Sequence, residues 1–194
     1  MTAITRVIEA TMEAKDPYTV QHQRRVTQIA LSIAGKMGLS GASLEKLRIA
    51  GTLHDLGKVG VPTEILVKPG KLTELEFSII KTHPMAGFEI LKPLEFPQET
   101  TQIVLQHHER WNGSGYPQGL LGNGILLEAR ILGVADVVEA MATHRPYRPA
   151  LGIDQAMEEI SRNRGILYDP TVVQTCSELY NENKLVDDFS GLRL

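Results

Sequence analysis

The chain has 194 residues, a formal net charge of -3 and a hydrophobic content of 42%. This length is enough for one sizeable core, and the slight negative charge excludes a general attraction to nucleic acid or anionic lipid, so any phosphate binding must be local. The single cysteine, Cys176, excludes an internal disulfide, and its spacing with Val172, Val173 and Tyr180 indicates helix packing.

A long helix is predicted near the N-terminus, where Asp16 and Pro17 form a cap. Its inward face repeats every three or four positions and consists of Val26, Ile29, Ala30, Ile33, Ala34 and Met37. His22 lies one turn before Val26 and is therefore expected to point at the core. Charged residues occur throughout residues 1–15, where a signal peptide would have its apolar segment, so we expect no signal peptide and a cytoplasmic protein.

The middle of the chain contains three further helical segments. The first is predicted to open at Ser43, to carry His54 and Asp55 and to stop at Gly57; residues 58–72 follow as a loop. Residues 73–76 have the spacing of a capping box, which predicts a short helix that ends before Pro84. A third helix starts after Pro97 and delivers two adjacent histidines, His107 and His108.

The C-terminal part begins with a glycine-rich loop over residues 112–119 and continues into a helix that is apolar on nearly every side. That helix carries charged residues and is not expected to span a membrane. Residues 153–163 and 170–180 predict two closing helices, and residues 182–194 a weakly ordered tail. No strand pattern, repeat or linker interrupts the chain, so we expect one all-α domain over residues 1–194.

Five of the six histidines fall on inward helix faces: His22, His54, His83, His107 and His108. A single histidine on such a face is usually a core residue bonded to a backbone carbonyl. Five histidines together with two acids, Asp55 and Asp136, favour a buried metal centre instead. Asp136 lies on the apolar helix, where an unpaired carboxylate costs on the order of several kcal/mol. The alternative partner for it is an arginine, either Arg130 or Arg145.

The ordered set of motifs resembles the HD-GYP family of cyclic di-GMP phosphodiesterases, a branch of the HD hydrolase superfamily. The resemblance runs from about residue 8 to 180 and rests on His22, His54-Asp55-x-Gly57-Lys58, His83-Pro84, His107-His108-Glu109, Gly113-x-Gly115-Tyr116-Pro117, Asp136 and Arg145-Pro146-Tyr147-Arg148. It implies an HD-domain helical bundle with additional C-terminal helices. It also implies a bacterial signalling enzyme that hydrolyses cyclic di-GMP to linear pGpG, GMP or both at a centre of two or three iron or manganese ions.

Two positions depart from the family pattern. The loop commonly has Asp before its Gly-x-Gly-Tyr-Pro run, and this chain has Asn112. Members with a third metal have Glu one turn before the first histidine, and this chain has Tyr18, whose neutral phenol is a poor ligand. We therefore expect two divalent ions, and the histidine and aspartate ligands without cysteine favour iron or manganese over structural zinc.

The expected ligands divide between these two ions. The resemblance implies that His22, His54 and Asp136 complete one ion and that His83, His107 and His108 bind the other. Asp55 has two carboxylate oxygens and lies centrally in the ligand set, so it is expected to bridge the ions. Two metals about 3.5 to 4 Å apart would share a bridging hydroxide, which attacks the phosphodiester. Asp55 and Lys58 are the predicted catalytic residues.

The predicted substrate-binding residues are Lys58, Arg145, Arg148, Gly115 and Tyr116. Lys58 is expected to reach a phosphate oxygen, although a lysine at a helix end is also favoured by the helix dipole. Arg145 and Arg148 are expected to grip phosphates, although such a pair on a turn is more often solvated. Gly115 and Tyr116 lie in a loop that shapes the substrate pocket, meets a cyclase-type or receptor signalling protein, or is an ordinary turn.

Three interpretations of the function compete. The first is the cyclic di-GMP phosphodiesterase. The second is another HD phosphohydrolase acting on a nucleotide, which the additional histidines disfavour because a one-metal site does not need them. The third is a catalytically weak module that binds the messenger or docks a partner, which the complete set of seven ligands and Lys58 disfavours. No nucleic acid polymer or membrane is an expected partner, and a homodimer is left open.

Overall fold

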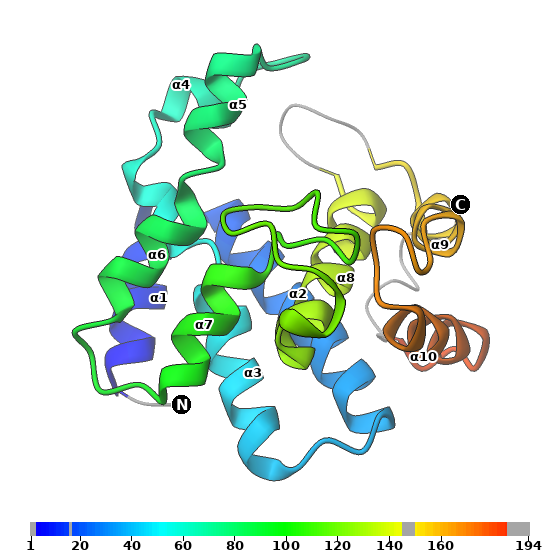
Figure 1. Cartoon of the computed structure of the whole chain (residues 1–194). Helices are drawn as coiled ribbons and strands as arrows, with labels where there is room; N and C mark the ends of the chain where they lie inside the picture. The colour runs from blue at the N-terminus through cyan, green and yellow to red at the C-terminus, as the bar shows by residue number, and fades with distance from the viewer. Residues whose placement is uncertain (1–2, 16, 145–149, 186–194) are drawn as a thin grey trace.

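A computed structural model describes residues 3–15, 17–144 and 150–185 of the chain (Figure 1). Within these residues every regular element is a helix, and strand-like pairing is limited to two isolated bridges, Asn112–Leu121 and Arg164–Tyr168. The all-α fold class predicted from the sequence is therefore confirmed. No helix in the described part is both long and apolar enough to cross a membrane.

The helices follow one another with short connections. In chain order they are α1 (Ala3–Lys15), α2 (Pro17–Lys36), α3 (Gly41–Leu53), the 3-10 helix η1 (Leu56–Gly60), α4 (Thr63–Leu66), α5 (Glu74–Ile80), α6 (His83–Leu91), α7 (Gln98–Gln106), the 3-10 helix η2 (Gly122–Gly124), α8 (Leu127–Ala142), α9 (Ile153–Arg162) and α10 (Pro170–Asn181).

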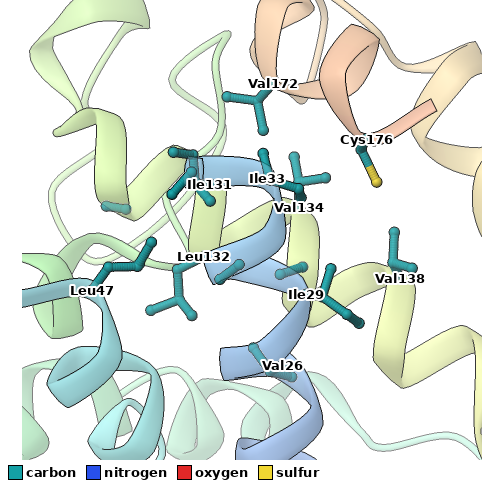
Figure 2. Packing of buried hydrophobic residues seen from close by; sticks show 14 of the residues in the cluster. Val26, Ile29, Ile33, Leu47, Ile131, Leu132, Val134, Val138, Val172 and Cys176 are labelled. Carbon is teal, nitrogen blue, oxygen red and sulfur yellow. The ribbon is translucent and has the colours of Figure 1, made fainter. Parts of the chain in front are cut away.

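The centre of the fold is α2, which packs against both α3 and α8. Figure 2 shows side chains of α2, α3, α8 and α10 meeting in one apolar cluster, whose labelled members are Val26, Ile29, Ile33, Leu47, Ile131, Leu132, Val134, Val138, Val172 and Cys176. The α2 members are those of the predicted inward face. Burial raises the pKa of Cys176 to about 12, so this thiol packs as an apolar group, as its spacing predicted.

Two helix boundaries in the N-terminal half differ from the prediction. The cap of α3 is Ser40, whose side chain accepts a hydrogen bond from the N–H of Ser43, so the helix begins earlier than expected. Either serine offers a suitable oxygen, and the backbone of Ser40 is the one that is extended. The predicted loop of residues 58–72 also contains the end of η1 and the short helix α4.

The sequence did not predict α6. The capping box at Thr73 and Glu76 is present, and α5 ends before Pro84 as expected. The chain then turns and starts a new helix at His83, with Pro84 in the first turn, where the missing N–H has no helical partner to lose. His83 consequently lies at the buried start of α6, which packs against η1 and α7.

The closing helices share the core of the rest of the chain. The α10 helix contacts α2, α8 and α9, and the side chain of Leu185 is buried against the same cluster. Residues 186–194 lie outside the described residues, so the predicted weak order of the tail stays a prediction there.

Candidate metal centre

The seven predicted metal ligands meet in the interior, although they come from separate helices. His22 lies on α2, His54 and Asp55 follow α3, His83 starts α6, His107 and His108 follow α7, and Asp136 lies on α8. All are buried except His108 and Asp136, which are partly buried, while the sixth histidine, His144, is exposed. The inward placement of five histidines, predicted from helical periodicity, is therefore confirmed.

The potential ligand atoms form three overlapping groups, within each of which the atoms lie within 4.8 Å of one another. The first group is His83, His107 and His108; the second is His22, His54 and Asp136; the third is His54, Asp55 and His107. Asp55 thus lies between the first two groups.

The two carboxylate oxygens of Asp55 face different groups of histidines. Oδ1 lies 3.4 Å from Nε2 of His83, whereas Oδ2 lies 3.9 Å from Nε2 of His22 and 3.7 Å from Nε2 of His54. A carboxylate with its oxygens aimed at two sets of nitrogen ligands has the arrangement that a bridging ligand requires.

The backbone fixes the direction of three histidine rings. Nδ1 of His54, His83 and His107 donates to the carbonyl oxygen three residues earlier, at 2.8, 2.7 and 2.6 Å, respectively. Because a carbonyl can only accept, Nδ1 carries the proton and a neutral ring presents the lone pair of Nε2 to the centre. The helix ends that carry these residues therefore aim inward three nitrogens that could bind a metal.

These inward nitrogens fit a cation. Nε2 of His83 and Nε2 of His107 lie 3.3 Å apart with their lone pairs facing, and the buried Nε2 of His54 has no hydrogen-bond partner within the described residues. Burial lowers the pKa of His83 to about 4 and that of His108 to about 3, so these two rings are neutral near pH 7 and keep a nitrogen lone pair free for a metal. The donor set thus matches a divalent metal.

His22 is oriented by a carboxylate that the sequence reasoning did not assign to the site. Its Nδ1 contacts the carboxylate of fully buried Glu139, and its Nε2 lies 3.1 Å from Oδ1 of Asp136. Glu139 also accepts hydrogen bonds from Nε of Arg25 at 2.6 Å and from Oγ1 of Thr143 at 3.0 Å. Burial alone would raise the pKa of Glu139, but the bonds to His22 and Arg25 lower it overall, so the carboxylate stays charged. The available signal was an acid one turn after Asp136 on an apolar helix.

Asp136 has His22 as a neighbour, and Arg130, one of its two alternative partners, forms its ion pair elsewhere. Arg130 pairs with Asp169 instead. The other alternative, Arg145, lies outside the described residues. Burial disfavours the charge of Asp136, but the hydrogen bond to His22 holds its pKa well below the usual value.

Lys58 lies at the centre of the site. Its Nζ is 2.7 Å from Oδ2 of Asp55, and this contact is possible because η1 turns the chain straight after Asp55. Gly57 lets η1 touch α6, because a Cβ at Gly57 would lie 1.9 Å from the carbonyl oxygen of His83. Arg145 and Arg148, the predicted phosphate-binding pair, lie outside the described residues.

The glycine-rich loop folds back over His108. The ring of Tyr116 lies 4.8 Å from the His108 ring, centroid to centroid, and 6.5 Å from that of Phe77 on α5. The carboxylate of Glu109 accepts hydrogen bonds from the backbone N–H groups of residues 118–120 at 2.6, 3.2 and 2.9 Å. This anchoring role of Glu109 was also not foreseen, because it needs a residue and a loop that meet only in the folded chain.

The replacement of the usual Asp by Asn112 leaves the start of this loop intact. Oδ1 of Asn112 accepts from both the N–H of Ser114 at 3.1 Å and its hydroxyl at 2.7 Å. An amide oxygen makes the same turn as a carboxylate oxygen, so the substitution is locally conservative.

A cavity of about 290 Å³ opens beside the cluster. Asp55 and Lys58 form one end of it, and apolar side chains from α1, η1 and α4 form most of its walls, among them Val7, Ile8, Met12, Val59 and Leu66. A mostly apolar hollow with a few charged groups at one end is typical of a small-molecule site.

Comparisons with known proteins agree with this geometry. A sequence model of the HD domain family matches residues 6–172. The chain is 43% identical over 164 residues to the cyclic di-GMP phosphodiesterase response regulator RpfG of Xanthomonas campestris, covering 84% of this chain and 43% of that protein. It is 40% identical over 181 residues to a cyclic di-GMP phosphodiesterase of Thermotoga maritima, covering 92% of this chain and 49% of that protein. The chain thus spans about half the length of these relatives or less.

A solved structure supports the fold. Bd1817, an HDG"Y"P protein from Bdellovibrio bacteriovorus, superposes with a TM-score of 0.70 at 20% identity, over 84% of this chain and 52% of that one. At this identity the likeness concerns the arrangement of helices alone.

Proposed function

The chain belongs to the HD domain family, as the resemblance to HD-GYP proteins predicted, and from this premise we propose that it hydrolyses cyclic di-GMP at a binuclear metal centre. Hydrolysis adds water across one phosphodiester and breaks a P–O bond to give linear pGpG, and a second round gives GMP. The observation that carries the proposal is the pair of ligand groups on either side of Asp55. We also propose that residues 1–194 belong to one domain.

The ligand assignment follows from these groups. His22, His54 and Asp136 would hold one ion, His83, His107 and His108 would hold the other, and Asp55 would contribute to both. Iron or manganese suits imidazole and carboxylate ligands without thiolate. Two ions rather than three are expected, because Tyr18 lies one turn before His22 and has a side chain 62% exposed to solvent.

The metal ions would supply the activated water and part of the charge that neutralises the phosphate. Lys58 donates hydrogen bonds to a non-bridging phosphate oxygen, and its contact with Asp55 keeps the ammonium beside that oxygen. The cavity next to Lys58 accepts part of the nucleotide. Arg145 and Arg148 bind the remaining phosphate charge, and the loop with Gly115 and Tyr116 shapes the site beside His108.

The substrate class is proposed from the relatives that are named cyclic di-GMP phosphodiesterases. The alternative is a catalytically weak module that binds a cyclic dinucleotide or docks a signalling partner. The complete ligand set disfavours it, because a binding module has no need to keep seven metal ligands buried together.

The decisive experiment combines metal analysis with product chromatography. The purified chain is reconstituted anaerobically with Fe²⁺ or Mn²⁺, its metal content is measured, and cyclic di-GMP, another cyclic dinucleotide and linear pGpG are each incubated with it. We expect two ions per chain and conversion of cyclic di-GMP to pGpG or GMP. If the chain bound two ions but hydrolysed only another of the tested compounds, cyclic di-GMP would not be its substrate. If it bound a cyclic dinucleotide and hydrolysed none of the compounds, the alternative binding module would be favoured.

A further inference from the structure

His108 is held in place differently from the other four clustered histidines. Three of those rings donate Nδ1–H to a carbonyl, and the ring of His22 contacts Glu139. No hydrogen bond to either ring nitrogen of His108 occurs within the described residues. Its neighbours are rings: His107 at a centroid distance of 4.1 Å, Tyr116 at 4.8 Å and His83 at 5.0 Å. Ring packing therefore decides which way the nitrogens of His108 point.

Tyr116 is the one of these neighbours that is not itself a proposed ligand. Its ring is inclined by only 32° to that of His108, so the two planes are closer to stacked than to perpendicular. The Tyr116 ring also meets Phe77 of α5 at 85°, an edge contact. The tyrosine ring thus contacts both α5 and the imidazole of His108.

The backbone places this ring with little freedom. The N–H of Tyr116 donates to the carbonyl oxygen of His108 at 3.3 Å. A Cβ at Gly115 would lie 2.3 to 2.5 Å from backbone atoms of residues 108–110, so only glycine lets the loop come this close. Glu109, directly after His108, anchors the far side of the loop through three N–H groups. The loop is consequently bonded to His108 at Tyr116 and to the neighbouring Glu109 at residues 118–120.

We propose that Tyr116 is a positioning residue for His108: the flat face of its ring holds the imidazole in the orientation that completes the group of His83, His107 and His108. The proposal rests on the proposed function only in assuming that this group holds a metal ion. It assigns the Gly-Tyr-Pro loop a task inside the chain, in which the phenol ring matters and the hydroxyl does not.

The test compares Tyr116→Phe with Tyr116→Leu. Metal titration of the metal-free chain should show two tight sites in the wild type and in Tyr116→Phe, which keeps the ring. In Tyr116→Leu one site should stay tight, because the ring contacts of Tyr116 are to His108 and Phe77 and not to His22 or His54. The other site should weaken by about 10- to 100-fold, as for other groups that orient a metal ligand.

A second readout follows the ring directly. Long-range ¹H–¹⁵N spectra of the chain loaded with diamagnetic Zn²⁺ should show the His108 nitrogen bound in the wild type and in Tyr116→Phe, and shifted toward the free position in Tyr116→Leu. Glu109→Gln weakens the anchor of the same loop without touching Tyr116. It should produce the same selective loss in smaller degree, which keeps the proposal testable if Tyr116→Leu does not fold.

Two results would overturn the proposal. One is a Tyr116→Leu chain that binds both ions as tightly as the wild type. The other is a Tyr116→Phe chain in which one site weakens as much as in Tyr116→Leu, which would make the hydroxyl, and not the ring, the group that positions His108. Neither measurement of metal binding depends on cyclic di-GMP, so an inactive chain with two tight sites would contradict the proposed function and leave this inference standing.

Discussion

At the scale of single residues, the site is defined by buried histidine nitrogens that have lone pairs but no hydrogen-bond donor facing them within the described residues. The Nε2 atoms of His83 and His107 present lone pairs to each other inside the core, and the buried Nε2 of His54 has no hydrogen-bond partner within the described residues. Such an arrangement is costly without a cation, because buried lone pairs repel and water cannot reach them. The charged side chains around these nitrogens, Asp55, Lys58 and Glu139, are expected to have different roles, and substitution of each should have a different measurable effect.

Asp55→Ala is expected to abolish hydrolysis and release metal, because both proposed ions lose a shared ligand at once. The protein should still fold, since the cost of a buried charge disappears with the carboxylate. Metal content and product formation are measured together, with Asp154→Asn on the exposed side of α9 as the matched control. Turnover near that of the wild type in Asp55→Ala would contradict the binuclear assignment.

Lys58→Ala is expected to keep the metal content and to lose on the order of a hundredfold in kcat, as preorganised charge stabilisers do. The Nζ of Lys58 contacts a proposed ligand but has no lone pair for a metal while it is protonated. Steady-state kinetics at saturating metal separates the two effects. If the variant turned over like the wild type, Lys58 would be a lysine placed by the helix dipole.

Glu139→Gln is expected to weaken metal binding at the His22 group by about 10- to 100-fold, because the amide is a poorer partner for Nδ1 of His22. Arg25 would also lose its charged acceptor, so a modest fall in stability should accompany it. The control is Glu128→Gln in the first turn of the same helix. Equal metal affinity in both variants would show that Glu139 does not support metal binding through His22.

At the scale of elements, the ligand geometry depends on how closely helix ends approach one another. The 3-10 helix η1 follows Asp55 directly and packs on α6, which starts with His83. The two ligands can therefore be only as close as the backbones of η1 and α6 allow. Gly57 sits at that contact, where its missing side chain leaves room for the carbonyl of His83.

Gly57→Ala should therefore force η1 and α6 apart. The added Cβ would lie 1.9 Å from the carbonyl oxygen of His83 and 2.5 Å from the backbone nitrogen of Gly87, and neither can rotate away. Overpacking of this kind costs about 1 to 3 kcal/mol, and it should also displace His83 from its ligand group. Urea unfolding and metal content report the two effects.

Gly60→Ala is the matched control for this substitution, because a Cβ there meets no atom within 4 Å. The two glycines lie at the start and the end of the same short helix. Equal stability of Gly57→Ala and Gly60→Ala would show that η1 and α6 tolerate a wider separation than the structure indicates.

At the scale of the whole molecule, the fold brings helix ends to one point and buries titratable groups there. Burial lowers the pKa of His54, His83, His107 and His108, in spite of the nearby acids. His22 has the opposite shift, because its bonds to Asp136 and Glu139 outweigh its burial and raise the pKa. The stability of the metal-free chain must therefore depend on pH.

The metal-free chain should lose stability as the pH falls from about 6.5 toward about 4. Below the ordinary histidine pKa of 6.5 the unfolded chain takes up protons, while His83, with a folded pKa of about 4, and His108, at about 3, stay neutral. The raised pKa of His22 does not offset this, because that ring is protonated in both states across this range. Melting temperatures in EDTA at pH 7.5, 6.0 and 5.0 check the trend.

The exposed His144 offers a control for this trend, since His144→Asn removes a histidine from outside the cluster. The variant should show the same decline of melting temperature with acidification as the parent chain. A melting temperature that rose as the pH was lowered from 6.5 to 5 would contradict the prediction. It would mean that the buried histidines take up protons in the folded state although burial lowers their pKa.

The sequence by itself determined the fold class and which seven histidine and aspartate side chains gather in the interior. Helical period places Val26, Ile29 and Ile33 on one face and His22 one turn before it, and this local rule needs no knowledge of the partner helix. The adjacent pairs at residues 54–55 and 107–108 are proposed ligands from neighbouring positions of one backbone, so they could also be found by inspection.

Only the tertiary structure decided how those residues are grouped and supported. His22 and Glu139 are 117 positions apart, and nothing local to either predicts that α2 and α8 bring them together. The start of α6 at His83 and the anchoring of the loop by Glu109 likewise depend on contacts made after the chain has folded. Local propensity fixes which face of a helix is buried, but the free energy of packing whole helices against one another fixes what each buried side chain meets there.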